Sequence, residues 1–462
     1  MAASDRSWTI TPTLAWFGVF LAAGLWWFDG DVSALANRLT VKRTDQTAKA
    51  GPVVAPPTVV AEAELPDEPA PQLPAPPAGS HDVGALADTC VQPLGAAPDH
   101  CKQWAMDGYY KAVALEQAGK LGHPVRVSWY GDSVVADDQM ATRLRERLQA
   151  ELGDGGPGYV YVVPPHRFNE NNSIKRSSSG TWFPHSISLQ QVPDGLYGVG
   201  GSTAETDGGS STIKLASGKV THVELYYLAM PKGGIATVTA DGTEVVQVDT
   251  SGARAPGWAA GTVAGAASFE VRTEHQVRLF GIDLENTSGA VVDNLGVVST
   301  NVKSFANNAP DHWQAELGHR AADLILIMIG ANEAEWLGPR DTDTKNYQAH
   351  YEKVLAVIRK ARPDSTCVVI SPTDQAEAKD DGYESRPVMP VLVEAQKQAA
   401  IAQGCAFYST YAWMGGKGSA VKWFKHGLVS SDFQHLSKKG ADKMADGLYG
   451  ALATGFKAHA HP

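Results

Sequence analysis

Cysteine is scarce in this sequence: the 462 residues include four cysteines, Cys90, Cys101, Cys367 and Cys405. No two of them have the Cys-x-x-Cys spacing that is typical of zinc sites, so the chain is neither a disulfide-rich scaffold nor a zinc module of that kind. The first two bracket a short loop, and the other two each open an apolar strand. Each pair could form a disulfide in an oxidising compartment. The alternative is two or four buried thiols.

Positive charge is also in short supply. The formal net charge is -11, the isoelectric point is near 5.7, and no basic stripe with interleaved aromatic residues is present. This balance argues against a nucleic acid partner and favours neutral or weakly charged substrates. Apolar residues make up 43% of the chain, which is enough for one large folded domain or two ordinary ones.

Residues 1–30 are predicted to be a membrane anchor. The stretch Leu14 to Phe28 is nearly uncharged and ends in the aromatic cluster Trp26-Trp27-Phe28, which suits a membrane interface. The alternative is a cleaved signal peptide, because Ala34-Leu35-Ala36 has the small-x-small form of a cleavage site. Both interpretations place the rest of the chain outside the cytoplasm.

The basic residues near this segment oppose that orientation. More of them follow the apolar stretch than precede it: Arg38, Lys42 and Arg43 follow, and Arg6 precedes. The positive-inside rule would then keep the C-terminal side in the cytoplasm, although long domains translocate largely regardless of charge.

Residues 31–81 are predicted to be a linker. Between Gly51 and Gly79 the chain is dense in proline among small and acidic residues. Such a tract extends by ~3.1 Å per residue and can hold a domain many tens of ångströms from a bilayer. Proline-rich tracts also serve as peptide ligands, but beside an anchor a plain spacer is the favoured interpretation.

The triplet Gly131-Asp132-Ser133 directly follows the apolar run Val125 to Trp129, which we predict to be a strand. The C-terminal ends of strands in an open α/β sheet are where such folds place their chemistry. Ser133 is therefore the candidate nucleophile. Gly-Asp-Ser is also ordinary turn composition, so the triplet needs support from other motifs.

Two later motifs supply that support. Gly330-Ala331-Asn332-Glu333 follows a second strand-like run, and the Asn332 amide can donate to a developing oxyanion. Asp432 and His435 lie three residues apart near the C-terminus. A histidine base oriented by a carboxylate is what a serine nucleophile needs for acyl transfer.

Together these motifs resemble blocks I, III and V of the SGNH (GDSL-type) hydrolase family, over roughly residues 123–456. Other tracts resemble the subgroup that removes O-acetyl groups from peptidoglycan: Asp154 to Tyr159, Val368 to Asp374, and Met414-Gly415-Gly416 ahead of Trp423. The resemblance implies acyl transfer through Ser133, with Asp432 and His435 as its catalytic partners and no cofactor or metal.

The family's second block contributes a backbone N–H to the oxyanion hole, and the segment Asp293 to Asn301 is the best candidate for it. Related sequences tend to have Gly-x-x-Gly here, whereas this chain has Gly296 followed by Ser299. The resemblance therefore implies an oxyanion hole built from Ser133, Asn332 and the turn from Gly296 to Ser299. A serine can serve if its backbone reaches the conformation that glycine adopts.

The predicted fold is α/β, with a flavodoxin-like doubly wound parallel sheet formed by residues 82–181 and 289–462. Strands alternate with helices there, including a helix over Cys101 to Gln117. Residues 182–288 change to period-two runs broken by glycine-rich turns, which predicts an inserted all-β, sandwich-like domain. Its aromatic residues Tyr226, Tyr227 and Trp258 could hold carbohydrate, but a place in the domain core is the favoured interpretation for each.

The predicted function is a serine esterase that removes O-acetyl groups from a cell-envelope glycan, for which the resemblance suggests peptidoglycan. The enzyme would work on the extracytoplasmic or periplasmic side, tethered to the inner membrane. Two alternatives stay open: a polysaccharide O-acetyltransferase that uses the same serine, and an inactive glycan-binding protein. Asp137 and Asp138 could suggest a metal site, but acids at a helix start are ordinary partners of the helix dipole.

Overall fold

The computed structural model describes residues 80–93, 101–338 and 340–459. The predicted anchor over residues 1–30 and nearly all of the predicted linker over residues 31–81 lie outside these residues. Within the described ranges, no helix combines the length and the apolar character needed to cross a membrane.

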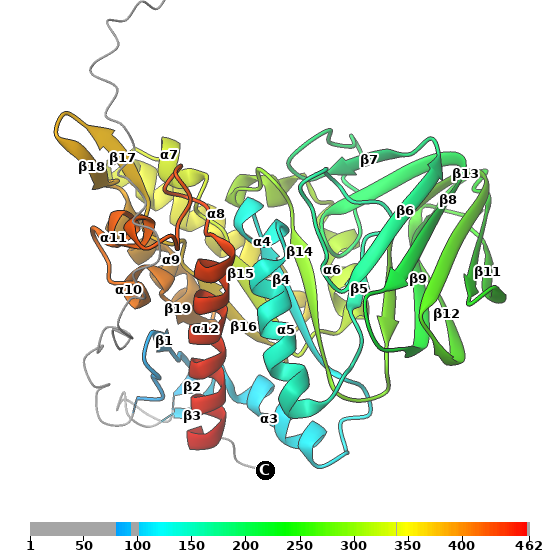
Figure 1. The fold of residues 1–462 in the computed structure, drawn as a ribbon, viewed down its shortest axis with the longest axis horizontal. Coiled ribbons are helices and arrows are strands. Elements are labelled where there is room, and N and C mark those ends of the chain that lie inside the picture. The colour runs from blue at the N-terminus through cyan, green and yellow to red at the C-terminus, as the bar shows by residue number, and fades with distance from the viewer. Residues whose placement is uncertain (1–79, 94–100, 339, 460–462) are drawn as a thin grey trace, which may run out of the picture. The chain divides into compact units, whose positions relative to one another are not determined.

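The centre of the α/β core is a six-stranded sheet (Figure 1). Its strands lie in the order β1 (Leu86–Ala87), β19 (Ala406–Tyr408), β16 (Thr366–Ile370), β15 (Leu324–Met328), β4 (Val125–Gly131) and β14 (Ala290–Gly296). All neighbours are parallel except the edge pair of β1 and β19. Numbered along the chain, the five parallel strands have the order 2-1-3-4-5, which confirms the flavodoxin-like fold.

The central strand β15 is apolar on both faces, because helices cover both sides of the sheet. In β15, Leu326 packs into one apolar core and Ile327 into the other. The first core is covered by α3 (Asp107–Gln117), α5 (Gln139–Leu152) and α12 (Lys438–His459), and the second by α6 (Pro310–Arg320), α8 (Asp341–Ala361) and α9 (Met389–Ala402). Burying one such side chain stabilises the folded state by roughly 1.5–3 kcal/mol. The two apolar layers therefore fix the position of the sheet edge at which Ser133 and Asn332 lie.

The extra β domain is an antiparallel sheet of nine strands with an apolar core of its own. Its longest strand is β13 (Ser268–Glu285), which pairs with four other strands. The others are β5 (Gly158–Val160), β6 (Ile174–Gly180), β7 (Phe183–Ser186), β8 (Ser202–Leu215), β9 (Val220–Ala229), β10 (Ile235–Ala240), β11 (Thr243–Asp249) and β12 (Ala255–Ala266). Two of these, β5 and β6, precede residue 182, where the sequence pattern changes.

The expected helix over Cys101 to Gln117 is wrong in its first part. Cys101 opens strand β3 (Cys101–Trp104), which pairs with β2 (Cys90–Pro93), and α3 begins at Asp107. A disulfide between Cys90 and Cys101 joins the two strands. A second disulfide joins Cys367 in β16 to Cys405, the residue before β19, and these two strands are neighbours in the central sheet.

Short elements complete the rim of the core. They are α4 (Ser133–Ala136), the 3-10 helix η1 (Val302–Asn307), α7 (Glu333–Trp336), the hairpin of β17 (Ala376–Lys379) and β18 (Gly382–Ser385), α10 (Thr410–Trp413) and α11 (Ser419–Lys425). Three of them, α4, η1 and α7, follow the C-terminal ends of β4, β14 and β15, where the predicted site residues lie.

Candidate active site

Ser133 opens helix α4 directly after strand β4. Asp132 caps this helix, and its carboxylate accepts the Val134 N–H at 2.9 Å. The turn is so tight that a Cβ on Gly131 would lie 2.2 Å from the Val135 side chain and 3.0 Å from the Met328 carbonyl. Glycine is therefore required at 131, and the turn presents Ser133 at the edge of the sheet.

Ser133, His435 and Asp432 form a hydrogen-bonded row. Ser133 Oγ lies 2.8 Å from His435 Nε2, and His435 Nδ1 lies 2.7 Å from Asp432 Oδ2. The other Asp432 oxygen accepts the backbone N–H groups of Gln434 and His435, each at 3.0 Å. Between acid and base, the buried Phe433 has a φ of 56°, which closes the turn. The structure thus brings together the three residues predicted as catalytic.

The electrostatics of the row fix the protonation of His435. Partial burial alone would raise the pKa of Asp432, but hydrogen bonds from the imidazole and two backbone N–H groups outweigh it and lower that pKa to about 2. The hydrogen bond to Asp432 in turn raises the pKa of His435. In the neutral imidazole Nδ1 then carries the hydrogen, and Nε2 is free to accept the serine proton.

Asn332 follows β15, the neighbour of β4 in the sheet. Its side-chain nitrogen donates to the Thr300 carbonyl at 2.7 Å, which fixes the amide and leaves its second N–H for another acceptor. The strand order reverses between β4 and β15, and open α/β sheets bind ligands at such a switch point. Ser133 and Asn332 thus flank the expected ligand position.

The oxyanion role predicted for Gly296 needs correction. Its backbone N–H already donates to Asn294 Oδ1 at 3.0 Å, so it has no hydrogen to offer a substrate. What Gly296 provides is space, because a Cβ there would lie 2.4 Å from the backbone nitrogen of Ala136 in α4. It lets β14 lie close beneath the helix that starts at Ser133.

Ser299 suits the donor role better. Its φ is 65°, the left-handed conformation that a glycine would adopt, and the residue is exposed. Among the described residues, no protein acceptor faces its backbone N–H. The same holds for the backbone N–H of Ser133 at the start of α4. Two backbone donors and the Asn332 amide are thus available at this edge.

Two buried acids, Asp132 and Glu333, are adjacent to predicted site residues in the sequence but were not themselves predicted to belong to the site. Asp132 is 1% exposed, and burial raises its pKa to about 6 although it accepts backbone N–H groups from both Val134 and Ala331. Glu333 is fully buried, accepts the Val302 N–H at 2.7 Å, and has its pKa raised to about 8 by that burial. Both carboxyl groups tie one motif to the backbone of another segment. Their adjacency to Ser133 and Asn332 in the sequence was the available signal.

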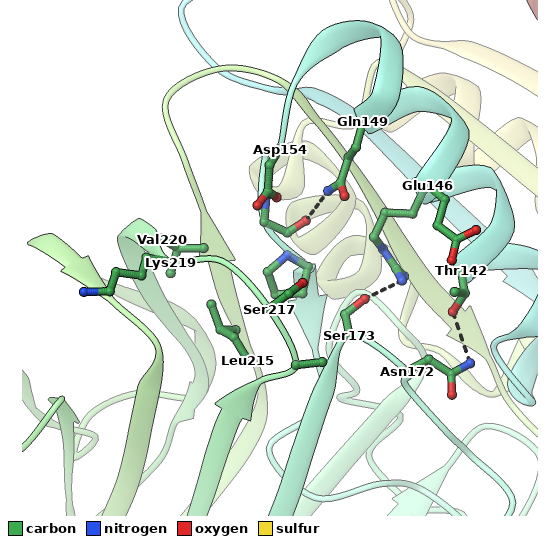
Figure 2. A pocket seen from close by; sticks show the side chains of 14 residues that line it. Thr142, Glu146, Gln149, Asp154, Asn172, Ser173, Leu215, Ser217, Lys219 and Val220 are labelled. Atoms are coloured by element: carbon green, nitrogen blue, oxygen red, sulfur yellow. Dashed lines mark hydrogen bonds between the residues drawn. The ribbon is translucent and has the colours of Figure 1, made fainter.

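A polar pocket of about 160 Å³ lies between α5 and the β domain (Figure 2). Its side chains are largely bonded to one another or to nearby backbone: Asn172 donates to Thr142, Arg145 to Ser173, and Gln149 to the Gly156 carbonyl. None of the predicted site residues lines this pocket. A second pocket, of about 460 Å³, lies beside α7. Its lining includes Trp336, which follows Asn332 by four positions in the sequence.

The three aromatic residues of the β domain that could hold carbohydrate pack inside the protein. Tyr226 is 1% exposed, and Trp258 stacks on His319 with ring centres 3.9 Å apart. Tyr227 packs against the apolar core of the β domain. Their packing leaves little ring surface for a sugar, in agreement with the favoured interpretation that these rings belong to the core.

One group in the described part of the chain has the spacing of metal ligands: His222 and Glu224 on β9 with Asp283 on β13. Asp283 already pairs with Arg320 at 3.1 Å, and Glu224 with His319 at 2.9 Å. The group belongs to the β domain and shares no residue with the row of Ser133, His435 and Asp432.

Comparison with known proteins places this geometry among known folds. Residues 252–443 match the model of the GDSL-like lipase/acylhydrolase family, a stretch that contains Asn332, Asp432 and His435 and begins after Ser133. The solved structure of a peptidoglycan O-acetylesterase is similar to this chain with a TM-score of 0.65 and 23% identity, over 76% of this chain and 97% of that one. No curated protein sequence matches the chain.

Two family two carbohydrate esterases are more distant. The one from Clostridium thermocellum, in complex with cellohexaose, has a TM-score of 0.28 and 9% identity over 59% of this chain and 98% of its own. The one from Cellvibrio japonicus has a TM-score of 0.26 and 12% identity over 61% and 99%. Likenesses this weak carry no argument about the site.

Proposed function

We propose that this chain is a serine esterase that removes O-acetyl groups from a cell-envelope glycan, namely peptidoglycan, because it has the SGNH hydrolase fold and its residues 252–443 match the GDSL-like lipase/acylhydrolase family. The observation that carries this proposal is the hydrogen-bonded row of Ser133, His435 and Asp432 at the sheet edge that also carries Asn332. Nucleophile, base, orienting acid and oxyanion donors are what acyl transfer through serine requires.

The reaction would begin with attack of Ser133 Oγ on the ester carbonyl carbon while His435 Nε2 takes the serine proton. The carbonyl oxygen becomes an oxyanion, which the backbone N–H groups of Ser133 and Ser299 and the free amide N–H of Asn332 would hold. Asp432 keeps Nδ1 protonated and stabilises the imidazolium. The bond to the sugar oxygen then breaks, and that oxygen takes the proton from His435.

The acetyl group is now an ester of Ser133. Water attacks this ester as His435 again accepts a proton, and a second oxyanion forms in the same place. When it collapses, the proton on His435 returns to Ser133 Oγ and acetate leaves. Both halves use the same residues, so the loss of one of them stops both.

Two further observations support a glycan of the cell envelope as the substrate. The peptidoglycan O-acetylesterase shares this fold over 97% of its own chain. Both cysteine pairs of this chain form disulfides, which persist in oxidising, extracytoplasmic compartments. We therefore place the enzyme outside the cytoplasm. The N-terminal segment, which lies outside the described residues, would hold it at the membrane.

The test is acetate release from O-acetylated peptidoglycan by the full-length chain, compared with Ser133→Ala and with Ser177→Ala, an exposed serine of β6, as the matched control. The proposal expects release by the wild type and the control and none by Ser133→Ala. Transfer of acetyl to an added glycan acceptor without free acetate would instead identify a transferase. Glycan binding with no acyl transfer at all would identify an inactive binding protein.

A further inference from the structure

The pocket of about 460 Å³ lies between η1, the end of α7 and the start of α8. Its lining includes Val302, Lys303, Trp336, Asn346, Tyr347 and His350. The pocket is tied to the candidate active site, because α7 follows directly on Asn332 and its first residue, Glu333, accepts the Val302 N–H. Two walls of the pocket, η1 and α7, are thus joined by a hydrogen bond one residue from Asn332.

Trp336 offers this pocket an exposed aromatic surface. Half of the side chain, 50%, is exposed, whereas the aromatic rings of the β domain that sequence reasoning considered are packed away. Aromatic side chains that line a pocket are common in ligand sites. Its apolar faces suit the C–H faces of a sugar ring.

Lys303 gives the same pocket a positive charge. Its ammonium lies 5.4 Å from the centre of the Trp336 ring and forms no salt bridge within the described part of the chain. The nearby Glu333 does not neutralise it, since burial raises the pKa of that carboxyl to about 8. Arg340, by contrast, is paired with Asp343 at 2.8 Å.

His350 adds a hydrogen-bonding atom to the wall. Its Nδ1 donates to the Asn346 carbonyl at 2.6 Å, which leaves Nε2 as an acceptor in the neutral ring. The pocket thus combines an aromatic surface, one unpaired cation and a polar rim. Small polar sites that bind sugars and other ligands use a few such groups for orientation.

We infer that this pocket is a subsite for a sugar residue that bears a free carboxylate, with its ring on Trp336 and its carboxylate paired with Lys303. The inference rests on the proposed function and narrows its substrate to O-acetylated glycans that also carry free sugar carboxylates. It also refines the expectation from net charge: a chain of charge -11 places a lone lysine where the substrate would lie.

The experiment compares two probes on the full-length chain. One is an O-acetylated peptidoglycan oligosaccharide freed of its peptides, whose lactyl groups end in free carboxylates, and the other is the same oligosaccharide with those carboxylates amidated. Hydrolysis of p-nitrophenyl acetate, which has neither a sugar nor a carboxylate, is the reference activity for each variant. For Lys303→Gln, the ratio of kcat/KM on the charged probe to that on the amidated probe falls about fivefold. Lys175→Gln, an exposed lysine of β6, keeps the wild-type ratio.

For Trp336→Ala, kcat/KM on both oligosaccharides falls about fivefold or more relative to p-nitrophenyl acetate, and Trp336→Phe restores most of it. The inference is overturned if Lys303→Gln affects both probes equally or neither. It is also overturned if Trp336→Ala lowers all three substrates together, which would mean a structural role.

A binding measurement distinguishes failure of the subsite from failure of the proposed function. Calorimetric binding of the charged, deacetylated oligosaccharide to Ser133→Ala protein needs no catalysis, and adding Lys303→Gln to that protein weakens binding if the subsite exists. Unchanged binding overturns the subsite whatever the enzyme does to esters.

Discussion

Two hydrogen-bonded networks of charged side chains in this molecule differ in their access to water. In the row of Ser133, His435 and Asp432, the histidine is 38% exposed and the acid 51%. In the second network, Arg320 is 1% exposed and binds three buried carboxylates, those of Asp283, Glu285 and Asp293. One network opens onto the candidate substrate site, and the other lies within the protein.

The contrast teaches how burial decides what a charge can do. Arg320 extends from α6 to acids on β13 and β14, and so fastens the β domain to the hydrolase core. Burial alone would lower its pKa, but the three carboxylates raise it well above its usual range, so its proton does not move. The row at the sheet edge instead holds a base whose proton must come and go.

Replacing His435 should have the largest effect on the first network. His435→Ala removes the acceptor of the serine proton, and kcat on an acetyl ester should fall about 10⁴- to 10⁶-fold, as when a triad member is removed. His426→Ala, an exposed histidine with no partner in the row, should keep kcat within about twofold. Steady-state kinetics on p-nitrophenyl acetate checks both. Substantial activity in His435→Ala would mean that another group serves as the base.

Replacing Arg320 should break the second network without touching the chemistry. Arg320→Met leaves three buried carboxylates without their shared cation, and the free energy of unfolding should fall by about 3–5 kcal/mol. Arg272→Met, which removes an exposed arginine paired with Glu270, should leave it nearly unchanged. Urea unfolding followed by tryptophan fluorescence measures both. A small loss for Arg320→Met would show that the acids take up protons and adapt.

The parts of the fold that follow from periodicity were predictable. The run Leu324 to Ile329 and its counterparts are apolar on both faces, and alternation with helices is enough to predict a doubly wound sheet. The Cys101 segment was not, because its helical pattern competes with the pairing of β3 and β2, which the disulfide between Cys90 and Cys101 joins. The attachment of β5 to β13 is likewise a tertiary contact with no local signal.

In the site, the side chains that would react were easier to predict than the backbone N–H groups, whose availability depends on local conformation. Ser133 and Asn332 stand in motifs at strand ends, Asp432 and His435 stand in a motif ahead of α12, and the structure brings Ser133, His435 and Asp432 into one hydrogen-bonded row. The availability of an N–H at Gly296 or Ser299 depends on the Asn294 side chain and on a φ value, and neither can be read from residue types. Trp336 lacks a motif and becomes a candidate only through the pocket beside it.

The pH dependence of the reaction should sharpen the contrast between a mobile and a fixed proton. The base must be neutral, so kcat/KM should rise with pH, about tenfold per unit at low pH, to a midpoint above the ordinary histidine value of 6.5, because Asp432 raises the pKa of His435. Asp432→Asn removes that carboxylate, and the midpoint should move to lower pH. The exposed Asp381→Asn serves as the control. A midpoint unmoved by Asp432→Asn would show that Asp432 does not set the pKa.

The smallest expected effect concerns the backbone donor that completes the row. Ser299 has a φ of 65°, which costs a non-glycine residue about 1–2 kcal/mol, whereas glycine adds about 0.4–1 kcal/mol of unfolded-state entropy. Ser299→Gly should therefore raise the free energy of unfolding by about 0.5–1 kcal/mol and keep kcat within about twofold, since the donor is the backbone N–H and not the hydroxyl. Ser217→Gly, at an exposed serine without a positive φ, should lower stability instead. If Ser299→Gly also lowers kcat about tenfold or more, the serine side chain itself takes part in the site, and the oxyanion hole contains a hydroxyl donor in place of the second backbone N–H.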